Sequence, residues 1–442
     1  MYDNVFYRDL KKVYPVAEKA KGIYIYDVDG KRYIDGSGGA CVVNIGHGVE
    51  EIIKAMTKQA KKVSFVHGSH FTTKALMKFA EMISTITPAK DLNRTYFVSG
   101  GSEAVETSLK LATQYWHELG YEQKFKVISR WGSYHGASMG ALALGGHTSR
   151  RKHFQPLIMH TPHIFPCYCY RCPFGKHQKS CDLECAESLE RTIKYEGPES
   201  ISAFIAEPIV GATAGAVVPR DGYWQRIREI CDHYNILLID DEVMVGVGRT
   251  GKNFALEHWG VIPDIIVTAK GLSGGYTPVG AVIVKQKIHD IIREKSGQFV
   301  HGYTFSQNPV SMAVGAEVLK YIKENKLVER VAKLESYFFK KLNELRNIDF
   351  VGDVRGKGLF AGIEFVRNKK TKETFNPMIK FSKKVADEAF RNGLITYPGS
   401  GGVDGVRGDH LLICPPYIIK EDEIDEMVDI LKKAIRKVSK IV

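Results

Sequence analysis

Two ionisable side chains follow apolar runs of the kind that form buried strands. Lys270 comes directly after residues 265–269 and precedes Gly271, and Asp241 lies in an acidic run after residues 236–239. A lysine in this position is either a surface residue whose stem covers apolar atoms or a nucleophile whose pKa burial lowers. Acids that abut a buried strand cost free energy unless a cationic group pairs with them. The two positions therefore indicate a candidate nucleophile and an acid that needs a cation.

A third strand end carries groups that suit a phosphate. Gly101 and Ser102 follow the apolar residues 96–98 and open a helical stretch over residues 103–116. Backbone N–H groups at the start of a helix, together with a serine hydroxyl, can bind a phosphate. A serine that simply caps the helix gives the same pattern, so both interpretations stay open.

Two more strand ends carry an aromatic ring and a carboxylate. Tyr134 lies between glycines after residues 126–129, and Glu207 follows residues 203–206. The tyrosine suits stacking on a flat cofactor ring, although an aromatic residue that covers a turn is equally compatible with the pattern. Glu207 places a carboxylate where its strand ends.

The elements that position these groups are short β-branched runs that alternate with helical stretches over residues 95–285. This alternation predicts an α/β fold with a mostly parallel sheet. Open sheets of this class bind ligands at the carboxyl ends of their strands, which is where all five groups lie. A hairpin is predicted at residues 24–34 around Asp29-Gly30, and a packed terminal helix at residues 421–438.

The composition of the 442 residues is that of a globular protein, with 44% hydrophobic and 25% charged residues. No stretch approaches the roughly 18 uncharged apolar residues of a membrane span, and residues 1–10 carry acids without an apolar run. We therefore expect neither a membrane nor a secreted protein, but a cytoplasmic one. The net charge is +12, yet the basic residues are scattered as doublets, so we expect no nucleic-acid partner. The excess charge better suits small anionic substrates.

Five of the eight cysteines are crowded together, and they are Cys167, Cys169, Cys172, Cys181 and Cys185. Paired cysteines at short spacing can bind zinc, but the separation between these pairs is shorter than in usual zinc fingers. A thiol-rich surface loop is the alternative, and we assign no metal to the chain. In a reducing compartment a disulfide framework is not expected.

A glycine-rich segment over residues 246–251 matches two nucleotide-binding patterns. Gly246, Gly248 and Gly251 satisfy the dinucleotide fingerprint, and the segment nearly satisfies the Walker A pattern. The acidic run separates the fingerprint from its strand, and Asn253 stands where a Mg²⁺-binding serine or threonine belongs. A nicotinamide-dependent dehydrogenase is therefore only a remote alternative.

Taken together, these motifs resemble the class-III pyridoxal-phosphate aminotransferases, in particular their ω-aminotransferase branch. The resemblance extends from the hairpin near residue 24 to the terminal helix. The matching segments occur in the order of that family: Phe97-Val-Ser-Gly-Gly-Ser-Glu-Ala-Val-Glu106, Tyr134-His-Gly136, Ala206-Glu-Pro208, Asp241-Glu-Val243, Gly248-Arg-Thr-Gly251, Thr268-Ala-Lys-Gly271, His301-Gly-Tyr-Thr-Phe-Ser306, Gly408-Asp-His410 and Pro415-Pro416.

The resemblance implies a cofactor and a role for each residue. Lys270 would form the Schiff base with pyridoxal 5'-phosphate and move the proton, and Asp241 would hold the pyridine nitrogen so that the ring accepts electrons. The other residues of the expected cofactor site are Gly101 and Ser102 at the phosphate, Tyr134 and Val243 on the two faces of the ring, Glu207, and Thr304 toward the phosphate of a neighbouring subunit.

The resemblance also implies the fold, the assembly and the reaction. It predicts a fold-type-I enzyme with a large cofactor domain at residues 61–310 and a smaller α/β domain built from residues 1–60 and 311–442. It predicts a homodimer with shared active sites, with a tetramer as the alternative assembly. The expected reaction moves an amino group from an amine or amino acid to a keto acid, with pyruvate favoured, by a ping-pong mechanism. Another pyridoxal enzyme of this fold, such as a racemase, an aminomutase or a decarboxylase, is the alternative.

Arg407 is the expected substrate residue. A keto acid carries a planar carboxylate, which a bidentate arginine binds best. Arg407 lies in the glycine-rich stretch 399–410, and in the resembled family a mobile arginine of this loop swings aside for uncharged amines. Three departures from the family pattern concern the pocket: Met244 where a glutamine is frequent, Tyr303 where histidine is usual, and Cys41 where several relatives have tryptophan, which would widen the donor pocket.

Overall fold

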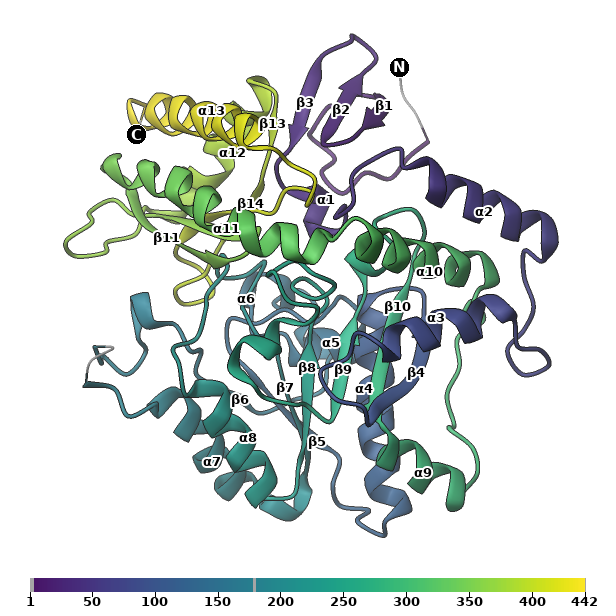
Figure 1. The fold of residues 1–442 in the computed structure, drawn as a ribbon. Helices are drawn as coiled ribbons and strands as arrows, with labels where there is room; N and C mark the ends of the chain where they lie inside the picture. The colour runs from purple at the N-terminus through teal and green to yellow at the C-terminus, as the bar shows by residue number, and fades with distance from the viewer. Residues whose placement is uncertain (1–3, 178–179, 442) are drawn as a thin grey trace.

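A seven-stranded sheet forms the centre of the protein. The computed structural model describes residues 4–177 and 180–441, and Figure 1 shows this sheet with helices around it. The strand order is β4-β10-β9-β8-β7-β5-β6. Strands β5 to β9 run parallel to one another, whereas β10 is antiparallel to both of its neighbours. The strands are β4 (Leu92–Val98), β5 (Lys126–Arg130), β6 (His163–Ile164), β7 (Ile201–Ala206), β8 (Leu237–Asp241), β9 (Ile265–Thr268) and β10 (Gly280–Lys285).

Every residue of β7, β8 and β9 is buried, because helices cover both faces of the sheet. Such strands consist of continuous apolar runs rather than alternating ones. Ile205 and Ile239 pack in one hydrophobic core with residues of α4 (Gly101–Glu118), whereas Phe204 and Leu238 pack in another with residues of α7 (Glu184–Glu196) and α8 (Tyr223–His233). The predicted mostly parallel α/β sheet is confirmed.

Of two smaller sheets, one combines strands from both ends of the chain and the other is built from the C-terminal part alone. The first has the order β1-β2-β3-β13 and the second the order β11-β12-β15-β14. β13 lies parallel to β3, which joins the N-terminal hairpin to the C-terminal part of the chain. Their strands are β1 (Ala17–Lys21), β2 (Tyr24–Asp27), β3 (Arg32–Asp35), β11 (Val351–Lys357), β12 (Phe360–Phe365), β13 (Leu394–Ile395), β14 (Tyr397–Ser400) and β15 (Asp409–Ile413). The boundaries predicted at residues 60 and 310 stay predictions.

The remaining helices link these sheets or cover them (Figure 1). They are α1 (Gly38–Cys41), α2 (Glu50–Lys62), α3 (Lys74–Ser84), α5 (Met139–Leu144), α6 (Thr148–Arg151), α9 (Gln286–Glu294), α10 (Pro309–Glu324), α11 (Leu327–Asn343), α12 (Phe381–Arg391) and α13 (Glu421–Ser439). The predicted hairpin and terminal helix are both present. Within the described residues, no helix is long and apolar enough to span a membrane.

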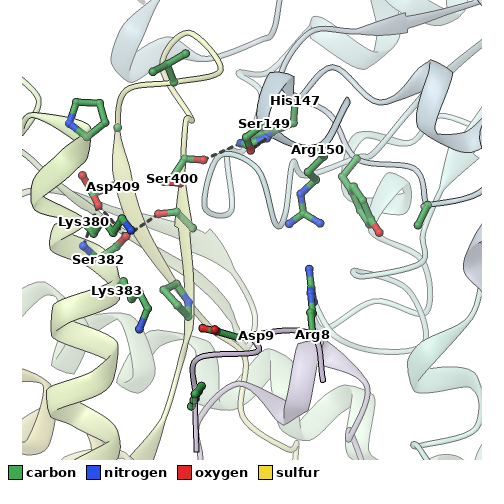
Figure 2. Close-up of a pocket in the computed structure, with 18 of the residues that line it drawn as sticks. Arg8, Asp9, His147, Ser149, Arg150, Lys380, Ser382, Lys383, Ser400 and Asp409 are labelled. Atoms are coloured by element: carbon green, nitrogen blue, oxygen red, sulfur yellow. Dashed lines mark hydrogen bonds between the residues drawn. The ribbon is translucent and has the colours of Figure 1, made fainter. Parts of the chain in front are cut away.

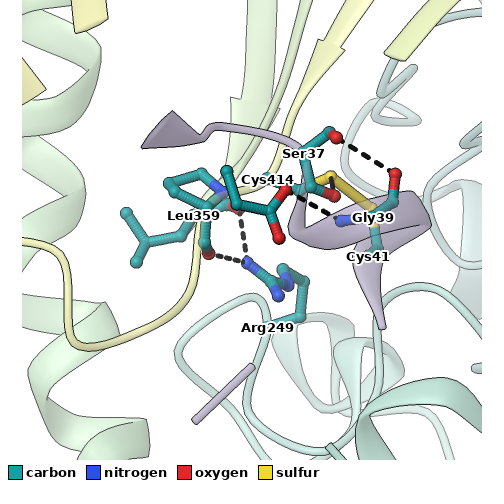
Figure 3. The surroundings of a disulfide bond; sticks show 8 residues. Ser37, Gly39, Cys41, Arg249, Leu359 and Cys414 are labelled. Carbon is teal, nitrogen blue, oxygen red and sulfur yellow. Dashed lines mark hydrogen bonds between the residues drawn. A yellow bond between two sulfur atoms is a disulfide. The ribbon is translucent and has the colours of Figure 1, made fainter. Parts of the chain in front are cut away.

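A disulfide joins Cys41 and Cys414, whose Cα atoms lie 5.7 Å apart although 373 positions separate them in the sequence. Figure 3 shows the bond between the turn after β3 and the segment after β15. The two segments are already adjacent, since the Cys414 N–H donates to the carbonyl of Gly36 over 2.9 Å. The expectation of a chain without disulfides is therefore wrong for this pair, because spacing in the sequence does not reveal that the two ends of the chain meet. Within the described part of the chain, the other six cysteines form no disulfide.

Reduction of this disulfide should lower the thermal stability of the protein. Cross-linking positions so far apart restricts the unfolded chain, and a bond of this kind typically contributes about 2–4 kcal/mol. We expect the midpoint of thermal unfolding to fall when a reducing agent is added. The Cys41→Ser variant should unfold at the lower temperature under both conditions. A midpoint that does not respond to reductant in the wild-type protein would show that the bond contributes nothing.

The glycine-rich segment at residues 246–251 does not have the geometry of a nucleotide-binding loop. It forms consecutive turns after β8, and a short 3₁₀ helix starts only at Ala255. Gly251 has a φ of +82°, and a Cβ at this position would lie 2.9 Å from the Cα of Ala332 in α11. The segment therefore packs against α11, which leaves the dehydrogenase alternative without structural support.

Candidate active site

A cavity of about 260 Å³ lies at the carboxyl ends of the central strands. Strand pairing explains why the predicted residues meet there. Ala206 of β7 is paired with Asp240 of β8, so the next residues, Glu207 and Asp241, lie level with each other. The cavity brings together seven predicted residues: Gly101, Ser102, Tyr134, Glu207, Asp241, Val243 and Lys270.

Lys270 enters the cavity from the end of β9. It begins a short 3₁₀ turn and has a φ of +44°, a conformation that few residues other than glycine adopt. The pKa of its amine is lowered to about 8, mainly because the amine is buried; Asp241 and Glu207 oppose this decrease and Arg150 adds to it. An amine with this pKa is uncharged in a substantial fraction of molecules near neutral pH, which is the state that attacks a carbonyl.

Asp241 is buried and oriented by two neighbours. Its Oδ2 lies 2.7 Å from Nδ1 of His135, and its Oδ1 accepts a hydrogen bond of 3.1 Å from the Val243 N–H. Asp240 is buried beside Glu242 rather than in the cavity, as strand alternation requires. Burial and the proximity of Glu242 raise the pKa of Asp240 well above its ordinary value. Asp241 is thus the acid that can meet a ligand in the cavity.

The start of α4 has the features of a phosphate site. Gly100 occupies the N-cap and has no side chain that could cap the helix. The first backbone N–H groups of α4 therefore remain available to an anion at this end of the cavity. A Cβ on Gly101 would lie 2.9 Å from Cγ1 of Val243, which shows that only glycine fits there. The Ser102 hydroxyl accepts a hydrogen bond of 3.0 Å from the Ala137 N–H and retains its own proton for a ligand.

Glu207 holds the cavity wall together. Its Oε1 accepts a hydrogen bond of 2.8 Å from the Tyr134 N–H, and its Oε2 accepts one of 2.7 Å from the Gly211 N–H. Burial raises the pKa of this carboxyl. Both oxygens are thus engaged by the backbone, and the geometry assigns Glu207 to positioning Tyr134.

Thr304 and Arg407 lie outside this cavity. Thr304 is exposed on the segment before α10, and its expected contact with a neighbouring subunit stays a prediction. The side chain of Arg407 is 60% exposed, and its Nε donates to Oδ2 of Asp404 over 2.6 Å. To reach a substrate, Arg407 would have to leave this carboxylate.

Cys41 does not line the cavity, because it forms the disulfide, and its neighbour Val42 contributes to the wall instead. The idea that a small residue at position 41 widens the donor pocket is therefore not supported by the placement of Cys41. The cysteines of the 167–185 cluster lie elsewhere, and buried Cys167 accepts a hydrogen bond of 3.2 Å from Nη1 of Arg130. Among residues 4–177 and 180–441, no three His, Cys, Asp or Glu side chains are placed to hold a metal ion.

Two residues that act on the site were not predicted from the sequence: His135 lines the cofactor cavity, and Arg150 lines the cavity beside it. His135 was visible only as the middle residue of the Tyr134-His-Gly136 motif, and its hydrogen bond to Asp241 could not be inferred from spacing. Arg150 carries no motif at all, yet its charge reaches Lys270.

Comparison with known proteins identifies the family. The profile described as "Aminotransferase class-III" matches residues 6–435. The uncharacterized aminotransferase YodT of Bacillus subtilis is 41% identical over 98% of this chain and 97% of its own length. The putrescine–pyruvate aminotransferase of Pseudomonas aeruginosa is 37% identical over 95% of this chain and 90% of its own.

Solved structures agree with these relatives. A transaminase from the marine bacterium Virgibacillus has a TM-score of 0.91 and 35% identity, covering 98% of this chain and 95% of its own. The ω-transaminase of Pseudomonas jessenii has a TM-score of 0.91 and 32% identity, covering 97% and 93% of the two chains. The predicted resemblance, the fold and the transaminase activity are confirmed by these matches. The chain belongs to the class-III aminotransferase family.

Proposed function

We propose that this aminotransferase uses pyridoxal 5'-phosphate to transfer the amino group of an amine or amino acid to a keto acid, with pyruvate as the favoured acceptor. One observation carries the proposal: Asp241 ends β8, Lys270 follows the end of the neighbouring strand β9, and both line the same cavity. The name of the Pseudomonas aeruginosa relative supports pyruvate as acceptor.

The residues present fit the cofactor. When bound, pyridoxal phosphate supplies an aldehyde that reacts with amines and a ring that accepts electron density. Lys270 would hold the aldehyde carbon and, once released, move the proton of the substrate. Asp241, oriented by His135, would keep a proton on the ring nitrogen. The start of α4 and Ser102 would bind the phosphate, with Tyr134 and Val243 packing against the ring.

A visible-absorbance titration tests the proposal. The purified protein with pyridoxal phosphate should show an absorbance band of the bound cofactor that disappears on addition of an amine donor and returns on addition of a keto acid. A panel of donors, each tested against pyruvate and 2-oxoglutarate, then identifies the substrates. A band that amines change but keto acids never restore would favour another pyridoxal chemistry, such as a racemase or decarboxylase.

The assembly and location belong to the same proposal. We infer a homodimer in which Thr304 reaches the cofactor phosphate of the neighbouring subunit, and a cytoplasmic enzyme. Thr304→Val should weaken cofactor retention in the dimer without changing the molar mass measured by light scattering. Cell fractionation with an antibody to the chain tests the location.

The pKa of Lys270 gives a pH dependence for cofactor loading. Because the pKa is lowered to about 8, the amine loses its proton as the pH rises through 8 rather than through the ordinary 10.5. Only the uncharged amine attacks the aldehyde. We therefore expect the rate of pyridoxal phosphate association with the cofactor-free protein to rise with pH and to have its midpoint near 8. Stopped-flow absorbance over a pH range that brackets 8 measures this rate, and a midpoint near 10.5 would contradict the lowered pKa.

A further inference from the structure

A second cavity, of about 880 Å³, opens beside the cofactor cavity and shares Tyr134 and Gly136 with it. Segments far apart in the sequence build its wall, including residues before β1, the α5–α6 region, the start of α12 and the end of β14 (Figure 2). A hydrogen bond of 2.7 Å between Nε2 of His147 and the carbonyl of Ser400 joins two of these segments. The cavity therefore adjoins the cofactor cavity and has a defined wall.

The wall of this cavity carries an excess of positive charge. It contains five cationic side chains, those of Arg8, Lys12, Arg150, Lys380 and Lys383, against three acids. Two of the acids are already engaged. Asp387 binds Nζ of Lys383 over 2.7 Å, and Oδ1 of Asp409 accepts hydrogen bonds from the N–H and hydroxyl of Ser382. The remaining cations can therefore receive an anion from solution.

Arg150 is the cation closest to the chemistry. Its guanidinium lies 4.3 Å from the centre of the Tyr134 ring, and its Nη2 donates to the Tyr397 hydroxyl over 3.4 Å. Among the described residues, no carboxylate lies within ion-pair distance of Arg150. Figure 2 shows the guanidinium groups of Arg150 and Arg8 facing one another across the cavity. Two like charges in this arrangement repel unless an anion lies between them.

We propose that Arg150, assisted by Arg8, binds the carboxylate of the substrate. The inference rests on the proposed function and deepens it, since it assigns the enzyme to donors and acceptors that carry a carboxylate. The planar fork of a guanidinium matches a carboxylate with two parallel hydrogen bonds. Stacking on Tyr134 holds this fork in place at the mouth of the cofactor cavity. In contrast to Arg407, Arg150 needs no rearrangement to leave a competing carboxylate.

Kinetics of Arg150→Gln test the assignment. We expect the KM for keto acids and amino acids to rise at least 10-fold, about 1.4 kcal/mol, while the KM for an amine without a carboxylate changes less than 2-fold. Arg150→Lys should be intermediate, because it keeps the charge but loses the fork. The matched control is Arg367→Gln, which removes an exposed arginine that pairs with Glu373 outside both cavities and should change neither class of substrate.

Two further measurements separate the possible outcomes. Calorimetric titration with glutarate, which has carboxylates but neither amine nor carbonyl, should detect binding to the wild-type holoenzyme and lose it in Arg150→Gln. If Arg150 serves only to hold Tyr134, the variant will impair both substrate classes equally and glutarate binding will persist, which overturns the proposal. An effect in Arg407→Ala with none in Arg150→Gln also overturns it. Absence of transamination in the wild-type protein would instead refute the proposed function.

Discussion

Replacing Lys270 by alanine should abolish turnover and leave the fold intact. The side chain would both hold the cofactor and move the substrate proton, so its loss should exceed the roughly 10²-fold effect typical of removing an acid–base group. The fold should persist because the amine forms no ion pair among the described residues, and burial lowers its pKa. Steady-state rates and the visible spectrum measure the catalytic loss, and circular dichroism with thermal unfolding checks the fold.

Lys252→Ala is the matched control for this variant. Lys252 is an exposed lysine in the loop after β8 and lies outside the cofactor cavity, so its replacement should leave rate and spectrum unchanged. If Lys270→Ala retains a substantial fraction of wild-type activity, the assignment of the nucleophile is wrong.

Asp241→Asn should leave cofactor binding measurable but slow the amine half-reaction by about 10²-fold or more. An amide cannot keep a proton on the ring nitrogen. Removing one group that stabilises the negative charge of a transition state typically slows the reaction by about 10²-fold or more. Single-turnover mixing of the holoenzyme with an amine donor isolates this step. The second readout is the cofactor dissociation constant, which should change far less than the rate.

Asp240→Asn provides an internal comparison one residue away. Its side chain lies beside Glu242, away from the cavity, and burial raises its pKa, so an amide at this position replaces a carboxyl that already tends to be neutral. We expect a rate close to that of the wild type. Equal losses in the two variants would show that the strand assignment is off by one residue.

The sequence predicted the residues of the cofactor cavity better than it predicted the residues that contact the substrate. Lys270, Asp241 and Glu207 follow apolar runs that can only be buried strands, and parallel strands place their carboxyl ends at one edge. Because the predicted sheet is mostly parallel, the carboxyl ends of its strands lie at one edge, and this was sufficient to predict that these side chains lie close together. Alternation along the strand lets only one of Asp240 and Asp241 face the cavity, and the resemblance of Asp241-Glu-Val243 to the family's segment selected Asp241.

The contacts that the sequence did not reveal depend on segments that meet only in the folded chain. Cys41 and Cys414 pair because β3 and the segment after β15 meet at the junction of both ends of the chain. Arg150 approaches Tyr134 through the turn at α6, and nothing in its local sequence distinguishes it from Arg151. Arg407 lies in the predicted glycine-rich loop, but its ion pair with Asp404 depends on the conformation of that loop.

The two cavities differ in how their walls are built, and this difference bears on how the enzyme could acquire new substrates. The cofactor cavity is framed by neighbouring strands of one sheet, whereas the outer cavity is framed by loops and helix ends from both ends of the chain. Exchanging residues 8–14 or 398–408 for those of a relative should therefore change which substrates the enzyme prefers, without moving the reactive groups. Laboratory evolution directed at these two stretches should yield variants with altered preference and preserved catalytic rate, because the frame that fixes the reaction is not among the residues that change.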